Sequence, residues 1–267
     1  MKRLFIYATA LVAAISCNGG TRDNDPWGEI TDEQIEKSEK SAKVVELTLK
    51  SSYMGQTMTY SVWLPADFDS EATYPFLYLL HGYEYGDQSR LDRCWLDKGN
   101  ASKIAYDYQK SGGVPMVIVM PNGLSSFYQG DYETYFHEEL MPKVEAEYKC
   151  NGKRAIAGLS MGGYGTLYHG LKYHDKFTYA YAMSPAAQSW MSSFVGAGDD
   201  ISTYPRITFE VGTEDFTVDN SQAKALYDAL VKKGLTCDYI ERGGTHDWKF
   251  WQECLPKTLR VVGATFK

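Results

Sequence analysis

Three residues of types that together support nucleophilic catalysis occur along the chain in the order serine, acid, histidine: Ser160, Asp215 and His246. A serine hydroxyl is a poor nucleophile until a base removes its proton, and an imidazole can do so near neutral pH. A carboxylate beside the imidazole orients the ring and stabilises its cationic form. The residues predict acyl transfer with Ser160 as nucleophile, His246 as base and Asp215 as the orienting acid.

The surroundings of Ser160 are typical of a nucleophile elbow, a sharp turn between a strand and a helix. The apolar run 155–157 predicts a buried strand, and the residues after Ser160 have helical character as far as Leu171. Gly158 and Gly162 flank the serine because a Cβ at either position would collide with neighbouring backbone. We expect a strained Ser160 with an exposed hydroxyl, facing the N-terminal N–H groups of the helix.

The acid of this group has one alternative in the sequence. Serine, then acid, then histidine is the chain order of α/β-hydrolases, and the interval from Asp215 to His246 has room for one helix and one strand. Glu214 is the alternative acid because it adjoins Asp215, whereas Asp219 is expected to cap a helix.

The other histidines are expected to be structural: His81, His137, His169 and His174. His81 directly follows a buried strand, and we expect its ring to form a hydrogen bond within the turn. An oxyanion on the reacting carbonyl needs two donors. One is the N–H of Met161, the residue after the nucleophile, and the other is expected from the loop that begins at His81, at the Tyr83 N–H.

The elements that position these residues alternate between strand and helix. The strands are predicted at 44–50, 57–64, 76–80, 115–120, 155–157, 177–183, 207–211 and 236–240, and the helices at 99–110, 131–148, after Ser160 to 171, at 219–233 and from 248 to about 259. Gly55 and Gln56 suggest that the first two strands form an antiparallel hairpin. The pattern predicts an α/β fold, a doubly wound and mostly parallel sheet with helices on both faces. The segment from Ser184 to Pro205 is too short for a large lid.

Composition narrows the class of protein and of site. The 267 residues are 44% hydrophobic, which suits one α/β domain, predicted at residues 43–267. The net charge is −7 and no basic run stands out, so nucleic acid is not an expected partner. We expect neither cofactor nor metal, since the cysteines after residue 17 lack the close spacing of a zinc site. Disulfides stay open, with three possible full pairings among Cys94, Cys150, Cys237 and Cys254.

The N-terminus has the pattern of an export signal. Positive Lys2 and Arg3 precede an apolar run, 4–15, that is too short to span a bilayer. The run ends in Ala-Ile-Ser-Cys17, which resembles the lipobox of bacterial lipoproteins; an ordinary secretory signal with an incidental cysteine is the alternative. We expect a signal peptide at 1–16, a lipid-anchored tether at 17–42, and a place in the periplasm or at the outer membrane or cell surface.

Six short motifs together resemble one known family, the esterase D-type esterases. This family includes feruloyl and acetylxylan esterases of the first carbohydrate esterase family, S-formylglutathione hydrolases, siderophore esterases and mycolyltransferases. The similarity runs from about Tyr53 to the C-terminus, and its motifs lie at 78–82, 119–123, 138–142, 158–163, 212–215 and 246–248. The resemblance implies an α/β-hydrolase fold, no metal, the triad given above, and Tyr83 and Met161 as oxyanion donors.

Aromatic residues on predicted loops and element ends suggest the substrate. The rings expected to stack on a sugar or phenolic acid are Tyr85, Trp95, Tyr128, Trp190 and Trp248, with Phe127 and Phe216 in similar places; the alternative is that several belong to the core. With export, they favour feruloyl esters of plant cell-wall xylan first and acetyl esters second. Other possibilities are S-formylglutathione, siderophore esters, or acyl transfer to an alcohol. The intact triad argues against a non-catalytic binding protein.

Overall fold

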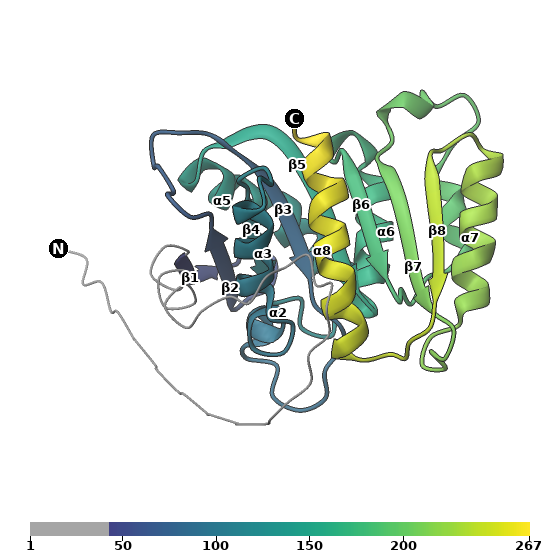
Figure 1. Ribbon diagram of the computed structural model, residues 1–267, viewed down its shortest axis with the longest axis horizontal. Coiled ribbons are helices and arrows are strands. Elements are labelled where there is room, and N and C mark those ends of the chain that lie inside the picture. The colour runs from purple at the N-terminus through teal and green to yellow at the C-terminus, as the bar shows by residue number, and fades with distance from the viewer. Residues whose placement is uncertain (1–42) are drawn as a thin grey trace, which may run out of the picture.

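Eight strands form one mixed sheet in the computed structural model, which describes residues 43–267 (Figure 1). The predicted signal peptide at 1–16, the tether at 17–42 and its Cys17 lie outside the described residues. The strands are β1 (Lys43–Lys50), β2 (Thr57–Leu64), β3 (Tyr74–Leu80), β4 (Val117–Pro121), β5 (Cys150–Leu159), β6 (Tyr179–Met183), β7 (Arg206–Gly212) and β8 (Cys237–Arg242). The α-helices are α2 (Cys94–Asp97), α3 (Ala101–Lys110), α4 (Asp131–Tyr135), α5 (Met141–Glu147), α6 (Met161–Lys172), α7 (Asn220–Lys232) and α8 (Trp248–Thr265).

The sheet is mostly parallel, as the strand–helix alternation predicts. Its strand order is β1-β2-β4-β3-β5-β6-β7-β8. β1 pairs with β2 in the predicted antiparallel hairpin, and β2 is also antiparallel to β4, whereas the remaining pairs are parallel. The carboxyl ends of the parallel strands therefore meet at one edge, the lower edge in Figure 1, where ligands bind in folds of this kind.

Helices cover both faces of the sheet and create two cores (Figure 1). α5, α6 and α7 pack on one face, and α3 and α8 pack on the other. Every residue of β3 is buried, because a central parallel strand is covered from both sides. None of the helices among residues 43–267 is long and apolar enough to cross a membrane.

Some of the predicted elements differ from the observed ones in extent or in conformation. β5 begins at Cys150, well before the predicted apolar run: Cys150 lies opposite Tyr74 of β3, and the register shifts before Arg154 pairs with Phe76. The helix predicted at 131–148 is continuous but contains a π-helical turn, Phe136–Leu140, between α4 and α5. In the described chain, the connection from β6 to β7 holds only two 3₁₀ turns, Ser189–Phe194 and Ile201–Thr203, so it forms no large lid.

A directional chain of hydrogen bonds crosses the core between α6, which carries His169, and the π-helical turn, which carries His137. A carbonyl oxygen can only accept, so the Tyr128 carbonyl requires a hydrogen on His169 Nε2, 2.9 Å away. His169 Nδ1 then accepts from His137 Nε2 at 2.9 Å, and the remaining nitrogen of His137 faces Lys176 Nζ at 3.4 Å. Both rings must be neutral in this arrangement. Burial lowers the pKa of His137 to about 2 and that of His169 to about 4.

These histidines predict a loss of stability in mild acid. Burial also lowers the pKa of His81 to about 4. In the unfolded chain the pKa of a histidine is about 6.5, so below that pH the folded protein binds fewer protons than the unfolded chain. Stability is therefore full above about pH 6.5 and falls as the pH drops toward 4, by up to about 1.4 kcal/mol per pH unit for each of the three rings. Urea unfolding between pH 7.5 and 5 measures this slope.

A variant at His174, a partly exposed histidine outside the active site, provides the control. His174 bonds to Thr203 Oγ1 and stacks on Tyr204, outside the chain of buried rings. His174→Gln should therefore keep the wild-type slope. An unfolding free energy that stays constant from pH 7 to pH 5 would contradict the neutral state of the buried rings.

Candidate active site

Ser160 lies at a tight turn between β5 and α6, as the glycine pattern predicts. Its φ is 53° and its ψ −115°, a sparsely populated backbone region that costs about 1–3 kcal/mol. A Cβ on Gly158 would lie 2.5 Å from the Gly162 carbonyl oxygen, and a Cβ on Gly162 would lie 2.5 Å from the His81 carbonyl oxygen. The two glycines therefore permit a backbone approach that any other residue would block.

Three side chains from three loops meet at this turn. His246 Nε2 lies 2.9 Å from Ser160 Oγ, and His246 Nδ1 lies 2.7 Å from Asp215 Oδ2. The carboxylate accepts, so Nδ1 carries the hydrogen and Nε2 presents a lone pair to the serine hydroxyl. Ser160 and His246 are partly exposed whereas the Asp215 carboxylate is fully buried. The geometry suits a nucleophile, a base and an orienting acid, the roles expected from the sequence.

The surroundings of Asp215 keep it ionised. Burial by itself would raise its pKa, but the hydrogen bond and charge of His246 and the backbone N–H groups of Thr217 and Val218 outweigh burial and hold the pKa below its usual value. The Thr217 N–H donates to Asp215 Oδ1 at 3.0 Å. The oxygen that faces His246 is thereby fixed in place.

Glu214, the alternative acid, has a different position. Its carboxylate accepts from the Gly244 N–H, and its own N–H donates to the Gly244 carbonyl at 3.0 Å. Glu214 therefore fastens the loop before His246 to the loop after β7, and it does not contact the imidazole. Asp219 caps α7 as predicted, accepting from the Ser221 N–H at 2.9 Å.

Glu210 is a buried carboxylate that joins the ends of β7 and β8, where the loops that carry Asp215 and His246 begin. Glu210 on β7 accepts from Arg242 Nε at 2.5 Å and from Lys257 Nζ at 2.6 Å, and it also binds the Tyr181 hydroxyl. Burial alone would raise the pKa of Glu210, but these donors lower it. Arg242 also donates to the Phe250 carbonyl at 3.0 Å. β7, β8 and α8 are thus tied together where the acid and histidine loops begin.

Two backbone amides beside Ser160 are available to an oxyanion. Met161 is the first residue of α6, and Tyr83 lies three residues beyond the end of β3. Among the described residues, neither N–H has a hydrogen-bond acceptor. Their role as oxyanion donors stays a prediction, and the positive N-terminal end of α6 favours it.

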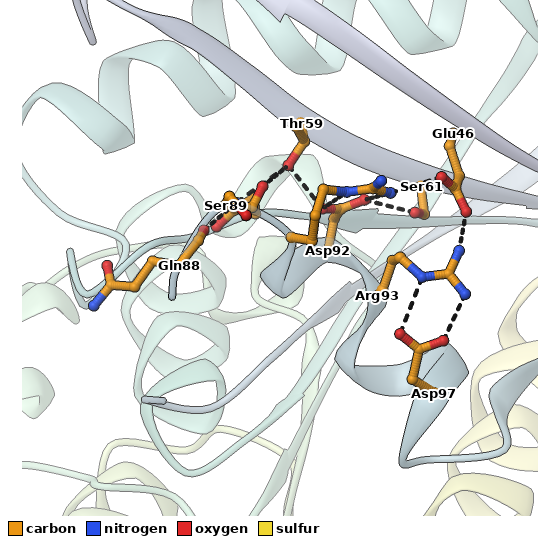
Figure 2. Close-up of polar contacts among 10 residues, drawn as sticks. Glu46, Thr59, Ser61, Gln88, Ser89, Asp92, Arg93 and Asp97 are labelled. Carbon is orange, nitrogen blue, oxygen red and sulfur yellow. Dashed lines mark hydrogen bonds and ion pairs between the residues drawn. The ribbon is translucent and has the colours of Figure 1, made fainter. Parts of the chain in front are cut away.

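The loop that carries Tyr83 and Tyr85 returns to the sheet at Asp92, a residue that the sequence did not single out. The Asp92 carboxylate is buried and accepts from Thr59 Oγ1 and Ser61 Oγ, both at 2.7 Å, and from Arg90 (Figure 2). Neighbouring ion pairs join Glu46 to Arg93 and Arg93 to Asp97. The sequence does not distinguish a buried aspartate from a solvated one in a loop, so no local signal could have identified Asp92.

The expectation that Trp95 and Tyr128 bind substrate is wrong. Their side chains are 1% and 0% exposed, so no ring face is open to a ligand. Trp95 Nε1 donates to the Leu80 carbonyl at 3.0 Å, and the Tyr128 hydroxyl donates to the His81 carbonyl at 2.9 Å. Both aromatic residues instead support the backbone between β3 and Tyr83.

The other predicted rings remain accessible at the carboxyl edge. Trp248 is half-buried and packs edge-on against Trp95, whereas Tyr85 is 90% and Trp190 49% exposed. Five of the six exposed aromatic rings of the described residues follow strands at this edge: Tyr83, Tyr85, Phe127, Trp190 and Phe216, with Tyr53 as the sixth. The exposed rings are therefore concentrated at the edge of the sheet that carries Ser160.

The four cysteines after residue 17 are all free thiols in the structure. Within residues 43–267, no group of three or more His, Cys, Asp or Glu side chains is arranged to hold a metal ion.

Known proteins are similar to this chain in sequence and fold. The profile of a family described as "Putative esterase" matches residues 51–262. An acetyl esterase of Caldicellulosiruptor saccharolyticus is 30% identical over 234 residues, which cover 70% of this chain and 82% of that protein. An endo-1,4-beta-xylanase/feruloyl esterase of Xylanibacter ruminicola is 26% identical over 82% of this chain, which spans 31% of that longer protein. A solved ferulic acid esterase superposes with a TM-score of 0.74 and 28% identity, over 85% of this chain and 99% of its own.

The adjacent acids Glu214 and Asp215 give a matched test of the triad. Asp215→Asn should lower kcat/KM on an aryl ester by about a hundredfold or more, because an amide no longer fixes the imidazole tautomer. Glu214→Gln should lower it by less than about tenfold, since this side chain acts only through the Gly244 backbone. A larger loss from Glu214→Gln would mean that the acid is misassigned.

Proposed function

The chain belongs to this esterase family and is a carboxylesterase; on that premise, we propose that it hydrolyses carboxylic esters of plant cell-wall carbohydrate through an acyl-enzyme on Ser160. The observation that carries the proposal is the Ser160–His246–Asp215 hydrogen-bonded chain at an edge that also gathers the exposed aromatic rings.

The geometry supports a two-stage mechanism. His246 Nε2 takes the Ser160 proton as Oγ attacks the ester carbonyl, and the Asp215 carboxylate stabilises the resulting imidazolium. The N–H groups of Tyr83 and Met161 donate to the oxyanion. His246 then gives the proton to the departing alcohol, leaving an acyl-Ser160. Water, which gives a proton to the same imidazole, attacks the acyl carbonyl. The bond between the acyl carbon and Ser160 Oγ then breaks, His246 returns the proton to Oγ, and the acid is released.

The proposed acyl group is feruloyl first and acetyl second. A flat hydroxycinnamoyl ring gains from stacking and from apolar burial, worth about 25 cal/mol for each Å² removed from water. An acetyl group offers far less area to Tyr85, Phe127 or Phe216, whose rings are exposed at the same edge of the sheet. The names of the similar proteins include both activities, an acetyl esterase and two ferulic or feruloyl esterases. Acyl transfer to an alcohol would use the same intermediate.

Export with a lipid anchor at Cys17 is a further part of the proposal, supported by the N-terminal sequence alone. An exported enzyme would meet cell-wall esters, whereas S-formylglutathione hydrolysis takes place in the cytoplasm. Cys17→Ser should move the enzyme from a membrane fraction to a soluble one, measured by activity after cell fractionation. An enzyme that fractionates identically with and without Cys17 would remove the anchor from the proposal.

The nucleophile is tested by covalent labelling. Ser160 should react with a fluorophosphonate probe, and Ser160→Ala should abolish both labelling and aryl-ester turnover while leaving the unfolding midpoint nearly unchanged. Ser192→Ala, a change at another serine beyond the same edge, is the control and should label as wild type. Undiminished turnover by Ser160→Ala would overturn the mechanism.

The substrate is tested by comparing kcat/KM on methyl ferulate, acetylated xylan and a long-chain aryl ester at one pH. We expect methyl ferulate to be preferred, and we expect Phe216→Ala and Tyr85→Ala to lower its kcat/KM by about threefold to tenfold through lost ring contacts. Tyr53→Ala, at the exposed ring outside this edge, should have no effect. A preference for acetylated xylan would reverse the order, and one for the long chain would exclude carbohydrate esters.

A further inference from the structure

His81 is a buried histidine whose two ring nitrogens have different, fixed roles. The ring is 1% exposed. The backbone N–H of Gly123 can only donate, and it lies 2.7 Å from His81 Nε2, so this nitrogen must carry a lone pair. The ring hydrogen is therefore on Nδ1, which donates to the Gly82 carbonyl at 2.6 Å. A protonated ring would oppose two donors at Gly123, and burial lowers the pKa of His81 to about 4, which keeps the ring neutral near pH 7.

The Gly82 carbonyl belongs to the same peptide group as the Tyr83 N–H. In a trans peptide the C=O and N–H bonds point in opposite directions, and residues 43–267 contain no cis peptide bond. A bond that holds the Gly82 oxygen toward the His81 ring thus fixes the direction of the Tyr83 N–H on the other side. We propose that His81, in its Nδ1–H tautomer, is a positioning residue that aims the Tyr83 N–H at the oxyanion; this rests on the proposed function.

Contacts with the elbow place this peptide beside the nucleophile. A Cβ on Gly82 would lie 3.3 Å from Ser160 Cβ and 2.5 Å from a Leu159 methyl carbon, so Gly82 packs directly against the serine turn. An amide that follows Gly82 is close enough to the reaction that a small rotation of the peptide would misdirect it.

Three consecutive carbonyls leading to Tyr83 each accept from a buried side chain. Leu80 accepts from Trp95, His81 from Tyr128, and Gly82 from the His81 ring. Each bond fixes one peptide plane, and the Gly82–Tyr83 plane is the last before the exposed part of the loop. Removing the His81 bond would therefore release the peptide that carries the Tyr83 N–H, while the two preceding planes stay fixed.

Two substitutions test the roles of the two ring nitrogens of His81 separately. In His81→Asn, the amide nitrogen can occupy the place of Nδ1 and donate to Gly82, whereas in His81→Gln the amide oxygen can replace Nε2 and accept from Gly123. If His81 positions the peptide, His81→Gln should lower kcat by about a hundredfold, the typical effect of losing one oxyanion donor. His81→Asn should retain kcat within about tenfold, and KM should change by less than about threefold in both.

The outcomes distinguish positioning from packing. Equal kcat for the two variants, a higher kcat for His81→Gln, or a loss expressed in KM would overturn the proposal. Unfolding midpoints are measured for both, and a His81→Asn protein that does not fold is replaced by His81→Gln against wild type, with kcat unchanged as the overturning result.

The tautomer is measured without any turnover. ¹⁵N NMR of the wild-type protein near pH 7 should show His81 with a protonated Nδ1 and a bare Nε2, and the opposite assignment would overturn the proposal. Wild-type turnover that Ser160→Ala abolishes tests the proposed function separately, so failure of one is not confused with failure of the other.

Discussion

The site depends on the close approach of two backbones, the first turn of α6 and the end of β3. At Gly162, a single methyl group would lie 2.5 Å from both the Leu80 and the His81 carbonyl oxygens. This contact brings the Met161 amide at the start of the helix and the loop that carries Tyr83 to the same serine. It also explains why Ser160 tolerates a positive φ, since packing on both sides leaves the turn no relaxed alternative.

Buried polar groups that take no part in the reaction hold the reacting loops. Glu210 joins β7, β8 and α8 beneath the acid and histidine loops, and Asp92 fastens the Tyr83 loop to β2. A buried carboxylate is costly unless several donors satisfy it, so each forces its partners into one arrangement. Positioning in this enzyme is thus distributed over charged groups well outside the triad.

Aromatic side chains near the carboxyl edge form two groups, one buried and one exposed. Trp95 and Tyr128 turn their polar atoms inward to backbone carbonyls, while Tyr85 and Phe216 leave their rings in solvent. Both kinds lie close to the carboxyl edge of the sheet. The exposed rings and the rings that support the backbone therefore differ in the direction of their side chains.

Local chemistry allowed the sequence by itself to determine the sheet, the elbow, and the serine and histidine of the triad. Apolar runs marked the parallel strands, and the absence of a side chain at Gly158 and Gly162 marked the turn, because these features act over a few residues. Only the tertiary structure decided between Asp215 and Glu214, since adjacent residues point in different directions and just one reaches His246. It alone decided the burial of Trp95, the anchoring by Asp92 and the tautomer of His81, because each depends on partners distant in sequence whose contacts no local pattern encodes.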